Sequence, residues 1–418
     1  MSSLATEIAV KYFQIGLSLL PENKWEQHYS LTLNLTCGLI ETLYLSTSYK
    51  KAEKLGNAAL FKTQSIFDKA RIYSLICHAF TLENRMEESL ATGLKALETL
   101  NIPIVDNHPK NIDIEYLKNL PEMTNPESLA AMPILTNVIA CALVTQSPLM
   151  MPLIYTMVNL SAKYGNSSKA PFGYVWYGCA LCWSMTNFEL GYRFGRLAID
   201  VMEKFTPCEV ETKVLHQFNS FIRHWYEHER FSIKQFPQVV QVSKESGDIE
   251  YGTYVAVNYV TNLLLIGDPL ASTQKKQRPY LDWVGSTQFS FSLTYGNIWA
   301  QLTQCLMGKN GDAMLLQGDF IDENKMILEM KRTKNNLNLF SLYAAKTILS
   351  YFNAHFSKSV IFAKETEQYE DAIGGLLPLT QVSFYGALAM LKTASKESMR
   401  DPENKKTFET YEEKLRLW

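Results

Sequence analysis

The chain has 418 residues, more than one compact hydrophobic core usually holds, so we expect several domains or an elongated repeat array. Its 40 basic and 42 acidic residues leave a formal net charge of −2, which excludes the strongly basic footprint of a nucleic-acid-binding protein. Hydrophobic residues make up 47% and charged residues 20%, a balance that excludes a disordered chain and indicates a folded one.

The start of the chain indicates where the protein resides. Residues 1–20 have amphipathic spacing with Glu7 and Lys11, and they lack the basic start, apolar run and cleavage site of a signal peptide. The odd number of scattered cysteines favours reduced, buried thiols over a disulfide framework. These cysteines are Cys37, Cys77, Cys141, Cys179, Cys182, Cys208 and Cys305. We therefore expect a cytoplasmic protein.

Apolar residues recur with helical spacing along the whole chain, and strand-like alternation is nearly absent. Clusters of Gly, Pro and Asn separate the helical segments. The predicted helices span residues 4–20, 24–45, 49–61, 66–82, 86–100, 112–119, 126–145, 149–164, 170–186, 189–205, 208–229, 231–245, 249–266, 269–277, 288–307, 322–333, 337–353, 357–370, 376–394 and 401–417. We divide the chain into N-terminal helical repeats (1–105), an irregular Pro-containing connection (106–125) and a continuing repeat array (126–418).

Four of these segments share one pattern, in which a bulky residue is followed by small residues three, seven and ten positions later. The sets are Tyr49, Ala52, Gly56 and Ala59; Met86, Ser89, Gly93 and Ala96; Phe188, Gly191, Gly195 and Ala198; and Phe356, Ser359 and Ala363, with Thr366 in the last place. On a helix these positions fall close to one face, where a second helix can pack backbone-close. Self-similarity at a period of roughly 34 to 45 residues is typical of stacked helical hairpins.

One segment invites a membrane interpretation, because residues 128–162 contain no charged side chain. Pro133, Pro148 and Pro152 interrupt the segment, and its longest clean apolar run is shorter than the ~20 residues that a membrane-spanning helix requires. We therefore predict two buried helices rather than a membrane span.

Four strings carry a family resemblance: "LPEMTNPESLAAMPIL", "MVNLSAKYGNSSKAPFGYVWYG", "GYRFGRLAIDVMEKF" and "FNSFIRHWYEH". Together they resemble the tetratricopeptide-like segment of very large bacterial signalling proteins, best known from cyanobacteria. In those proteins a serine/threonine-kinase-like domain and an AAA-type ATPase precede the helical region, and a GAF sensor and a histidine kinase follow it. The resemblance runs from about residue 9 to residue 418 and implies a regulatory helical module.

The repeats and the resemblance together predict an all-α fold, a right-handed α-solenoid of degenerate tetratricopeptide-like helical hairpins. The phosphate-binding GxxxxGK[ST], HRD and DFG motifs are absent from the sequence, so we expect a non-catalytic scaffold without a cofactor. The resemblance implies that it relays between an ATPase/kinase part and a sensor histidine kinase of a two-component system. Because the last helix has no capping sequence behind it, we expect a piece of a longer array.

The expected partners are another protein or the adjacent ATPase, GAF and histidine-kinase domains, with no nucleic acid and no membrane insertion. An alternative hypothesis is a regulatory repeat domain that senses a peptide or a small molecule.

A third, less favoured hypothesis comes from the string "HWYEH". It places His224, Glu227 and His228 in the H-x-x-E-H pattern of inverted zinc peptidases. Two His residues four apart on a helix can share one zinc ion, and the Glu can act as a general base. The sequence offers no third ligand in a matching helical context, so we predict a repeat helix with no metal and no catalytic residues rather than a zinc-dependent hydrolase. A lone C-x-x-C, Cys179 and Cys182, likewise lacks the second pair that a structural zinc site needs.

A polar stripe on the same predicted helix is the best candidate for a binding surface. It consists of His216, Asn219, Arg223 and Tyr226, spaced i, i+3, i+7 and i+10. First helices line the concave side of tetratricopeptide stacks, so we expect the stripe to face a hydrated groove, with Trp176 and Trp183 from the neighbouring repeat beside it. Aromatic and Arg side chains are the usual anchors of protein interfaces. The alternative is that these residues fill a tight inner curve and bind nothing.

Overall fold

The computed structural model describes residues 4–107, 113–287, 290–309, 312, 314–393 and 402–417. Over these residues the regular secondary structure is helical, with 21 α-helices and no β-strand, and only two isolated β-bridges occur. The predicted all-α class is therefore confirmed. Part of the predicted irregular connection, residues 108–112, lies outside the described residues.

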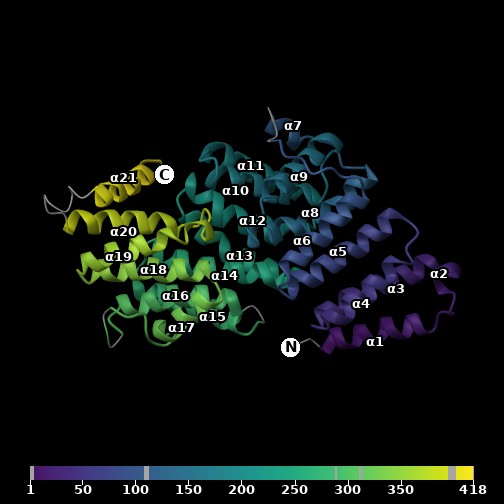
Figure 1. The fold of residues 1–418 in the computed structure, drawn as a ribbon, viewed down its shortest axis with the longest axis horizontal. Helices are drawn as coiled ribbons and strands as arrows, with labels where there is room; N and C mark the ends of the chain where they lie inside the picture. The colour runs from purple at the N-terminus through teal and green to yellow at the C-terminus, as the bar shows by residue number, and fades with distance from the viewer. Residues whose placement is uncertain are drawn as a thin grey trace. The chain divides into compact units, whose positions relative to one another are not determined.

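The helices follow the chain in the order shown in Figure 1. The first eleven are α1 (Leu4–Ser18), α2 (Lys24–Gln27), α3 (Tyr29–Leu45), α4 (Tyr49–Leu60), α5 (Ile66–Leu82), α6 (Met86–Thr99), α7 (Ile114–Lys118), α8 (Pro126–Val144), α9 (Met150–Tyr164), α10 (Ala170–Trp183) and α11 (Phe188–Met202). The other ten are α12 (Glu211–Gln217), α13 (Arg230–Ser246), α14 (Ile249–Leu265), α15 (Leu270–Gly285), α16 (Ser290–Leu306), α17 (Glu323–Arg332), α18 (Asn336–Phe352), α19 (Phe356–Glu367), α20 (Pro378–Thr393) and α21 (Pro402–Leu417).

Most of these helices begin and end close to the predicted positions, and two differences have a physical reason. The predicted helix 24–45 is interrupted at His28, whose φ of −132° and ψ of 44° are not helical. The predicted helix 269–277 continues to Gly285 as α15, with Pro279 inside it. Pro costs a helix one backbone hydrogen bond. In α15 the buried Leu281 beyond Pro279 compensates through packing, because it belongs to a cluster with residues of α14 and α16.

The chain divides into two compact units. Unit 1 comprises Met1–Tyr177 and Arg196–Val210, and unit 2 comprises Gly178–Gly195 and Glu211–Trp418. The predicted connection 106–125 falls inside unit 1.

Unit 1 consists of consecutive helices that pack on one another, α3 on α4, α4 on α5, α5 on α6 and α8 on α9. Helix α8 also packs against α5 and α6, and its buried residues include Leu135, Val138 and Ile139. Among the described residues α8 is the one helix whose length and apolarity match a membrane span. Its most apolar stretch has a mean hydropathy of 1.7, and 56% of that stretch is buried inside the protein. Helices α8 and α9 are thus the pair of helices predicted for residues 128–162.

Unit 2 packs in the same sequential way. Helix α14 lies against α13, α15 and α16, α18 lies against α16 and α19, and α20 lies against α18, α19 and α21. In Figure 1 the green and yellow helices α18, α19 and α20 follow one another side by side. One large cluster of buried residues runs through these helices, from Phe236 to Tyr411, with the Trp299 side chain fully buried.

The four repeated small-residue sets all follow the same kind of turn. A residue with a left-handed backbone, φ between 50° and 62°, lies two positions before each set begins: Thr47, Asn84, Thr186 and Ala354. In three of the turns, the N–H of the next residue donates to a carbonyl five positions back, at 2.8 to 2.9 Å, as in a Schellman-type helix end. None of the four is Gly, which usually occupies such positions, so the turns carry no obvious mark in the sequence.

The small residues of these sets lie in tight helix–helix contacts. Ser89 and Ser359 make the same bond, in which the Oγ donates to the carbonyl oxygen of the residue twelve positions earlier at 2.9 Å. A Cβ added at Gly56 would lie 2.7 Å from Ile76 Cγ1, and one added at Gly195 would lie 2.6 Å from Phe218 Cδ2. Real side chains do not approach so closely, so these positions accept little more than a hydrogen atom.

Candidate functional site

The polar stripe lies on an irregular helix in unit 2. In place of the predicted helix 208–229, α12 ends at Gln217 and continues as a π-helical turn, η2 (Phe218–Ile222), and then as a 3₁₀ turn, η3 (Arg223–Trp225). Single π turns are rare and occur often at functional sites. Because a π turn adds a residue to the helical turn, side chains that follow it no longer keep the spacing of a regular α-helix.

Three of the four stripe residues are buried within the protein. The exposed fractions are 5% for His216, 0% for Asn219 and 8% for Arg223, whereas Tyr226 is 58% exposed. The expectation that the stripe lines a hydrated groove therefore does not hold for the first three residues. Their polar groups are instead satisfied mainly inside the protein, as burial requires.

His216 and Asn219 make separate buried hydrogen bonds. Asn258 of α14 donates through Nδ2 to His216 Nε2 and to Ser220 Oγ, each at 3.1 Å. Asn219 donates to the Leu215 carbonyl at 2.9 Å. Burial, with a smaller contribution from the positive charge of Lys213, lowers the pKa of His216 to about 3, so the imidazole is neutral at physiological pH. His216 therefore joins α12 to α14, and neither His216 nor Asn219 offers a free surface.

Arg223 connects the buried Asn219 to the surface. Its NH1 donates to Asn219 Oδ1 at 3.2 Å, and its Nε donates to Glu227 Oε2 at 2.8 Å. The Tyr192 hydroxyl donates to the other oxygen of Glu227. Arg223 is thus held by two partners, and Glu227 accepts from both Arg223 and Tyr192.

An aromatic patch lies next to this ion pair, formed by Tyr192, Tyr226 and Phe231. The rings of Tyr192 and Tyr226 stack with centroids 4.3 Å apart and an interplanar angle of 17°. Phe231 is 48% exposed, and its ring centroid lies 5.3 Å from the Arg223 guanidinium carbon, within the range of a cation–π interaction. Large aromatic side chains beside an ordered Arg are the composition typical of an interface anchor.

Of the two tryptophans predicted beside the stripe, Trp183 is linked to His216 through the Phe221 ring, and Trp176 lies in other surroundings. Trp183 is half-buried, and its ring meets Phe221 edge to face with centroids 5.8 Å apart. Trp176 belongs to unit 1, where it is 2% exposed and packs against Phe172. A tryptophan as buried as Trp176 presents no surface to a partner.

Sequence reasoning missed Tyr192, Asn258 and Phe231. Tyr192 is visible in the sequence only as part of a small-residue helix, and Asn258 lies in an apolar segment 42 residues from His216. Phe231 lies at the start of α13, next to the exposed Arg230. No spacing rule connects these residues, since only the packing of α11, α13 and α14 brings them to the stripe.

The H-x-x-E-H residues occupy three different environments. Both ring nitrogens of His224 are buried, and burial lowers the pKa of its imidazole to about 4. Glu227 accepts from Arg223 and Tyr192, while the exposed His228 accepts the Arg230 N–H through Nδ1 at 3.1 Å. The described residues include no group of three His, Cys, Asp or Glu side chains placed to hold a metal ion.

We predict that the purified protein contains far less than one zinc ion per chain. Residues 224 and 228 do not lie on one α-helical turn, because the helix changes to a 3₁₀ turn at Arg223. Elemental analysis of protein purified without chelator measures the zinc content directly. Stoichiometric zinc that disappears in a His224→Ala variant would contradict this prediction and support the hydrolase hypothesis.

Glu229, directly before α13, is a buried carboxyl group close to the site. It is 7% exposed, and its Oε1 accepts from Asn262 Nδ2 at 2.7 Å. Burial raises the pKa of Glu229 to about 8, although the bond from Asn262 opposes the shift. The side chain is therefore largely protonated at neutral pH in the folded protein and ionised in the unfolded one.

We predict that Glu229→Gln stabilises the protein increasingly as the pH rises from about 4.5 to about 8. Between these values only the unfolded state has released the proton, so the wild type loses stability with rising pH by up to roughly 1.4 kcal/mol per pH unit. The amide cannot ionise and avoids this loss. Urea unfolding at about pH 5 and about pH 8 measures the effect, with the exposed Glu245→Gln on the same helix as the control. If Glu229→Gln raised the free energy of unfolding equally at both pH values, the titration of Glu229 would be ruled out as the cause.

Comparison with known proteins relates the chain distantly to a signalling protein. No family model matches the sequence. The hybrid signal transduction histidine kinase G of Dictyostelium discoideum is 20% identical over 337 residues, which cover 69% of this chain. The same region spans 10% of the length of that relative.

A solved structure offers a weaker likeness. The crystal structure of BtubC (BKLC) from P. vanneervenii covers 60% of this chain and 94% of its own chain, with 13% sequence identity and a TM-score of 0.39. A TM-score of this size is too low to assign a shared arrangement of helices.

Proposed function

We propose that the protein is a non-catalytic scaffold of signal transduction, an α-solenoid of degenerate tetratricopeptide-like hairpins that docks a protein partner. The distant similarity to a histidine kinase supports a signalling context. The repeated turn with its left-handed residue, and the Ser bond that recurs at Ser89 and Ser359, support a repeat origin for the helix pairs. The partner belongs to the class of ATPase, GAF or histidine-kinase domains that accompany such modules, and the setting is the cytoplasm.

The observation that carries the docking proposal is the aromatic patch of Tyr192, Tyr226 and Phe231. Tyr226 and Phe231 keep about half of their surface exposed, while Arg223 and Glu227 beneath them are fixed by hydrogen bonds. A rigid support lowers the conformational entropy that a surface loses when it binds. The patch is thus ready to anchor a partner without rearranging.

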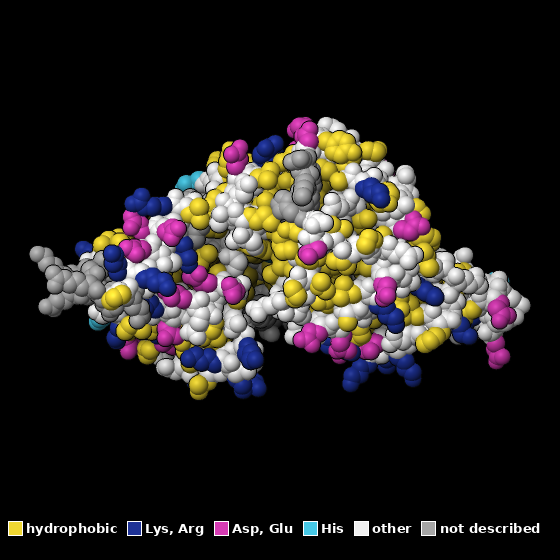
Figure 2. Space-filling model, turned by 45° about the horizontal axis from the view of Figure 1, so that its top comes forward, with side chains coloured by type: hydrophobic (Ala, Val, Ile, Leu, Met, Phe, Trp, Pro, Cys, Tyr) yellow, Lys and Arg dark blue, Asp and Glu magenta, His cyan; other side chains and the backbone are white. Residues whose placement is uncertain are grey.

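The charge distribution favours a protein partner over nucleic acid. Figure 2 shows Lys and Arg side chains interspersed with Asp and Glu over the visible face, and no field of one sign. Phosphate backbones are held by concentrated positive charge. An uncharged aromatic anchor beside a compensated Arg instead suits a mixed polar and apolar protein surface.

We predict that the double variant Tyr226→Ala and Phe231→Ala weakens binding of the partner domain by at least tenfold and leaves the helical circular dichroism spectrum unchanged. Both side chains are exposed, so their removal costs the fold little, whereas truncating two interface anchors typically costs more than 1 kcal/mol each. A pull-down with isolated ATPase, GAF and histidine-kinase domains of the proposed partner class, followed by titration, measures the change.

The matched control is Phe61→Ala with Tyr116→Ala, which removes two other exposed aromatic side chains, 89% and 58% exposed. Equal binding by the wild type and the Tyr226 and Phe231 double variant would place the docking surface elsewhere. An equal loss with the control variant would indicate non-specific adhesion of exposed aromatic groups.

A further inference from the structure

Helix α1 of unit 1 carries an apolar face that is exposed to solvent. Ile8, Tyr12, Ile15 and Leu19 are between 42% and 80% exposed. Their spacing of four, three and four residues places them in one stripe along a helix. The stripe includes Leu19, one position beyond α1, because the Leu19 N–H still donates to the Ile15 carbonyl at 3.0 Å. Four large apolar side chains therefore lie in line on the outside of unit 1.

The opposite face of α1 is already used for packing within unit 1. Val10, Phe13 and Leu17 pack against a cluster of buried residues that comes mainly from α3. The contact is close, since a Cβ added at Gly38 of α3 would lie 2.5 Å from two carbon atoms of the Phe13 ring. Figure 1 shows α1, in purple, next to α3 at the edge of unit 1. Rotating α1 to bury the stripe would break this contact, so the stripe stays on the outside.

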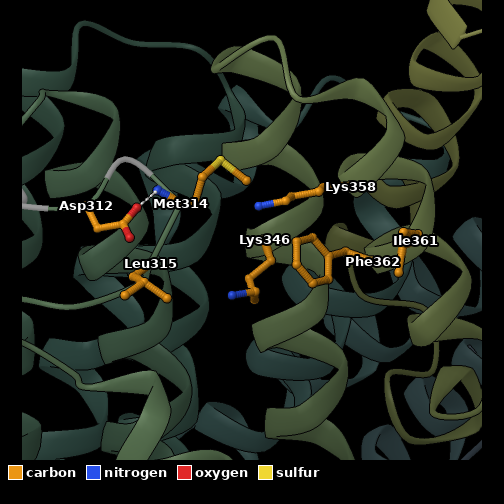
Figure 3. A pocket seen from close by; sticks show the side chains of 7 residues that line it. All are labelled: Asp312, Met314, Leu315, Lys346, Lys358, Ile361 and Phe362. Carbon is orange, nitrogen blue, oxygen red and sulfur yellow. Dashed lines mark hydrogen bonds between the residues drawn. The ribbon is translucent and has the colours of Figure 1, made fainter.

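The exposed stripe is large for a surface feature without a function. At these exposed fractions its four side chains together present roughly 500 Å² of apolar surface, as much as the patches that mark interaction sites. Exposed apolar side chains that occur singly need no partner. Ile361 of α19 is an example, which Figure 3 shows on the same helix as Lys358, beside a pocket that Lys346 also lines. A helix that is apolar on two opposite faces, as α1 is, is normally covered on both.

We propose that the stripe binds the α1 stripe of a second copy of the chain, with the two helices antiparallel. The spacing of the four residues is the same in either direction, so a two-fold axis between positions 13 and 14 brings each of them opposite another apolar residue. Ile8 of one copy meets Leu19 of the other, and Tyr12 meets Ile15. Spacings of three and four residues are those of coiled-coil helices, whose side chains interlock. The face is therefore complementary to itself.

Charge and size favour a second copy in this orientation. Glu7 and Lys11 are the charged residues of α1, and in the antiparallel pair they come opposite positions 20 and 16, which are uncharged. Like charges therefore do not meet across the interface, where they would oppose binding. The Tyr12 ring packs against the smaller Ile15 in two equivalent layers, which fills the space evenly. The dipoles of the two helices point in opposite directions, so their unlike ends lie close together.

The size of the interface predicts a reversible dimer. Two stripes together would bury roughly 1,000 Å², the lower limit for a specific interface, so we expect a dissociation constant on the order of 10 µM. The inference rests on α1 of unit 1 and not on the docking proposed above, because the aromatic patch belongs to unit 2. A dimer would carry two such patches and would hold two partner domains at once.

Sedimentation equilibrium of the full chain between about 1 and about 200 µM tests the proposal. We expect the mass to rise with concentration from 47.7 kDa toward twice that value. Ile15→Glu should weaken association at least tenfold, since each copy would bury a carboxylate against Tyr12 of the other. Ile15 is 52% exposed in the single chain, so the variant keeps its helical circular dichroism spectrum.

A control and a second variant make the test specific. Ile361→Glu places the same charge at an Ile that is 57% exposed on α19, and it should associate like the wild type. The double variant Tyr12→Lys with Ile15→Glu should associate more tightly than either single variant. In the antiparallel pair each new ammonium group meets the new carboxylate of the other copy, whereas a parallel pair would bring like charges together.

Three results would overturn the proposal. A chain that stays at 47.7 kDa over the whole concentration range would leave the stripe to a helix of another protein. Association of Ile15→Glu as tight as that of the wild type, or equal weakening by Ile361→Glu, would place the contact elsewhere. A double variant that associates no more tightly than the single variants would exclude the antiparallel pairing.

Discussion

Lys346→Met should destabilise unit 2 by about 3–5 kcal/mol, the typical cost of removing one partner from a buried ion pair. The Lys346 and Glu323 side chains are each 9% exposed, so water cannot replace the lost ammonium group. Glu323 would keep its bond from the Leu316 N–H, but its charge would be buried without a counter-ion. Urea unfolding followed by circular dichroism measures the loss of free energy of unfolding.

The double variant Lys346→Met and Glu323→Gln should recover much of this loss, because it leaves no buried charge unpaired. Lys358→Met is the control for removing a lysine from the neighbouring helix α19, and it should change stability by less than about 0.5 kcal/mol because the side chain is exposed. A single variant as stable as the wild type would show that the ion pair is open to water in solution.

Gly195→Leu and Ala52→Leu should each destabilise the protein by about 1–3 kcal/mol through overpacking. Ala52 is 0% exposed, and even a methyl group at Gly195 would approach the Phe218 ring to 2.6 Å and 2.9 Å at two carbon atoms. The neighbouring helix must therefore move away or distort. The shift of the thermal unfolding midpoint gives the size of the effect.

Ala58→Leu is the matched control, since Ala58 is exposed on α4, the same helix as Ala52. It should leave the midpoint unchanged or raise it slightly, because Leu and Ala both favour helices. If Ala52→Leu behaves like Ala58→Leu, α4 does not pack closely on its neighbours, and the interpretation of the small-residue pattern is wrong.

The order of the helices could be predicted from the sequence because helical periodicity is a local property. Apolar spacing located α4 to α6, α8, α9 and α18 to α20 to within a few residues. The repeat of small residues was also visible, and positions such as Gly56 and Gly195 lie where helices approach closely. The relation to signalling proteins came from whole strings of residues, and the distant histidine-kinase relative agrees with it at that level.

The candidate site could be predicted only in part. The stripe was chosen on the assumption of a regular helix, and the π turn at Phe218–Ile222 ends that regularity. A π turn forms where tertiary packing favours one extra residue in a helical turn, and the helix propensities of the residues do not reveal its position. His216 pairs with Asn258 of α14, Asn219 is buried beside Arg223, and the exposed aromatic side chain that lies over Arg223 is Phe231.

The sequence by itself determined that the chain is helical, where its helices lie and which of their faces must carry small residues, since each of these depends on neighbours within a few positions. The tertiary structure alone decided which polar groups pair. Asn258 with His216, Tyr192 with Glu227 and Lys346 with Glu323 join positions 23 to 42 residues apart. Such pairs form because buried polar groups must find partners, and the available partners depend on how the helices pack.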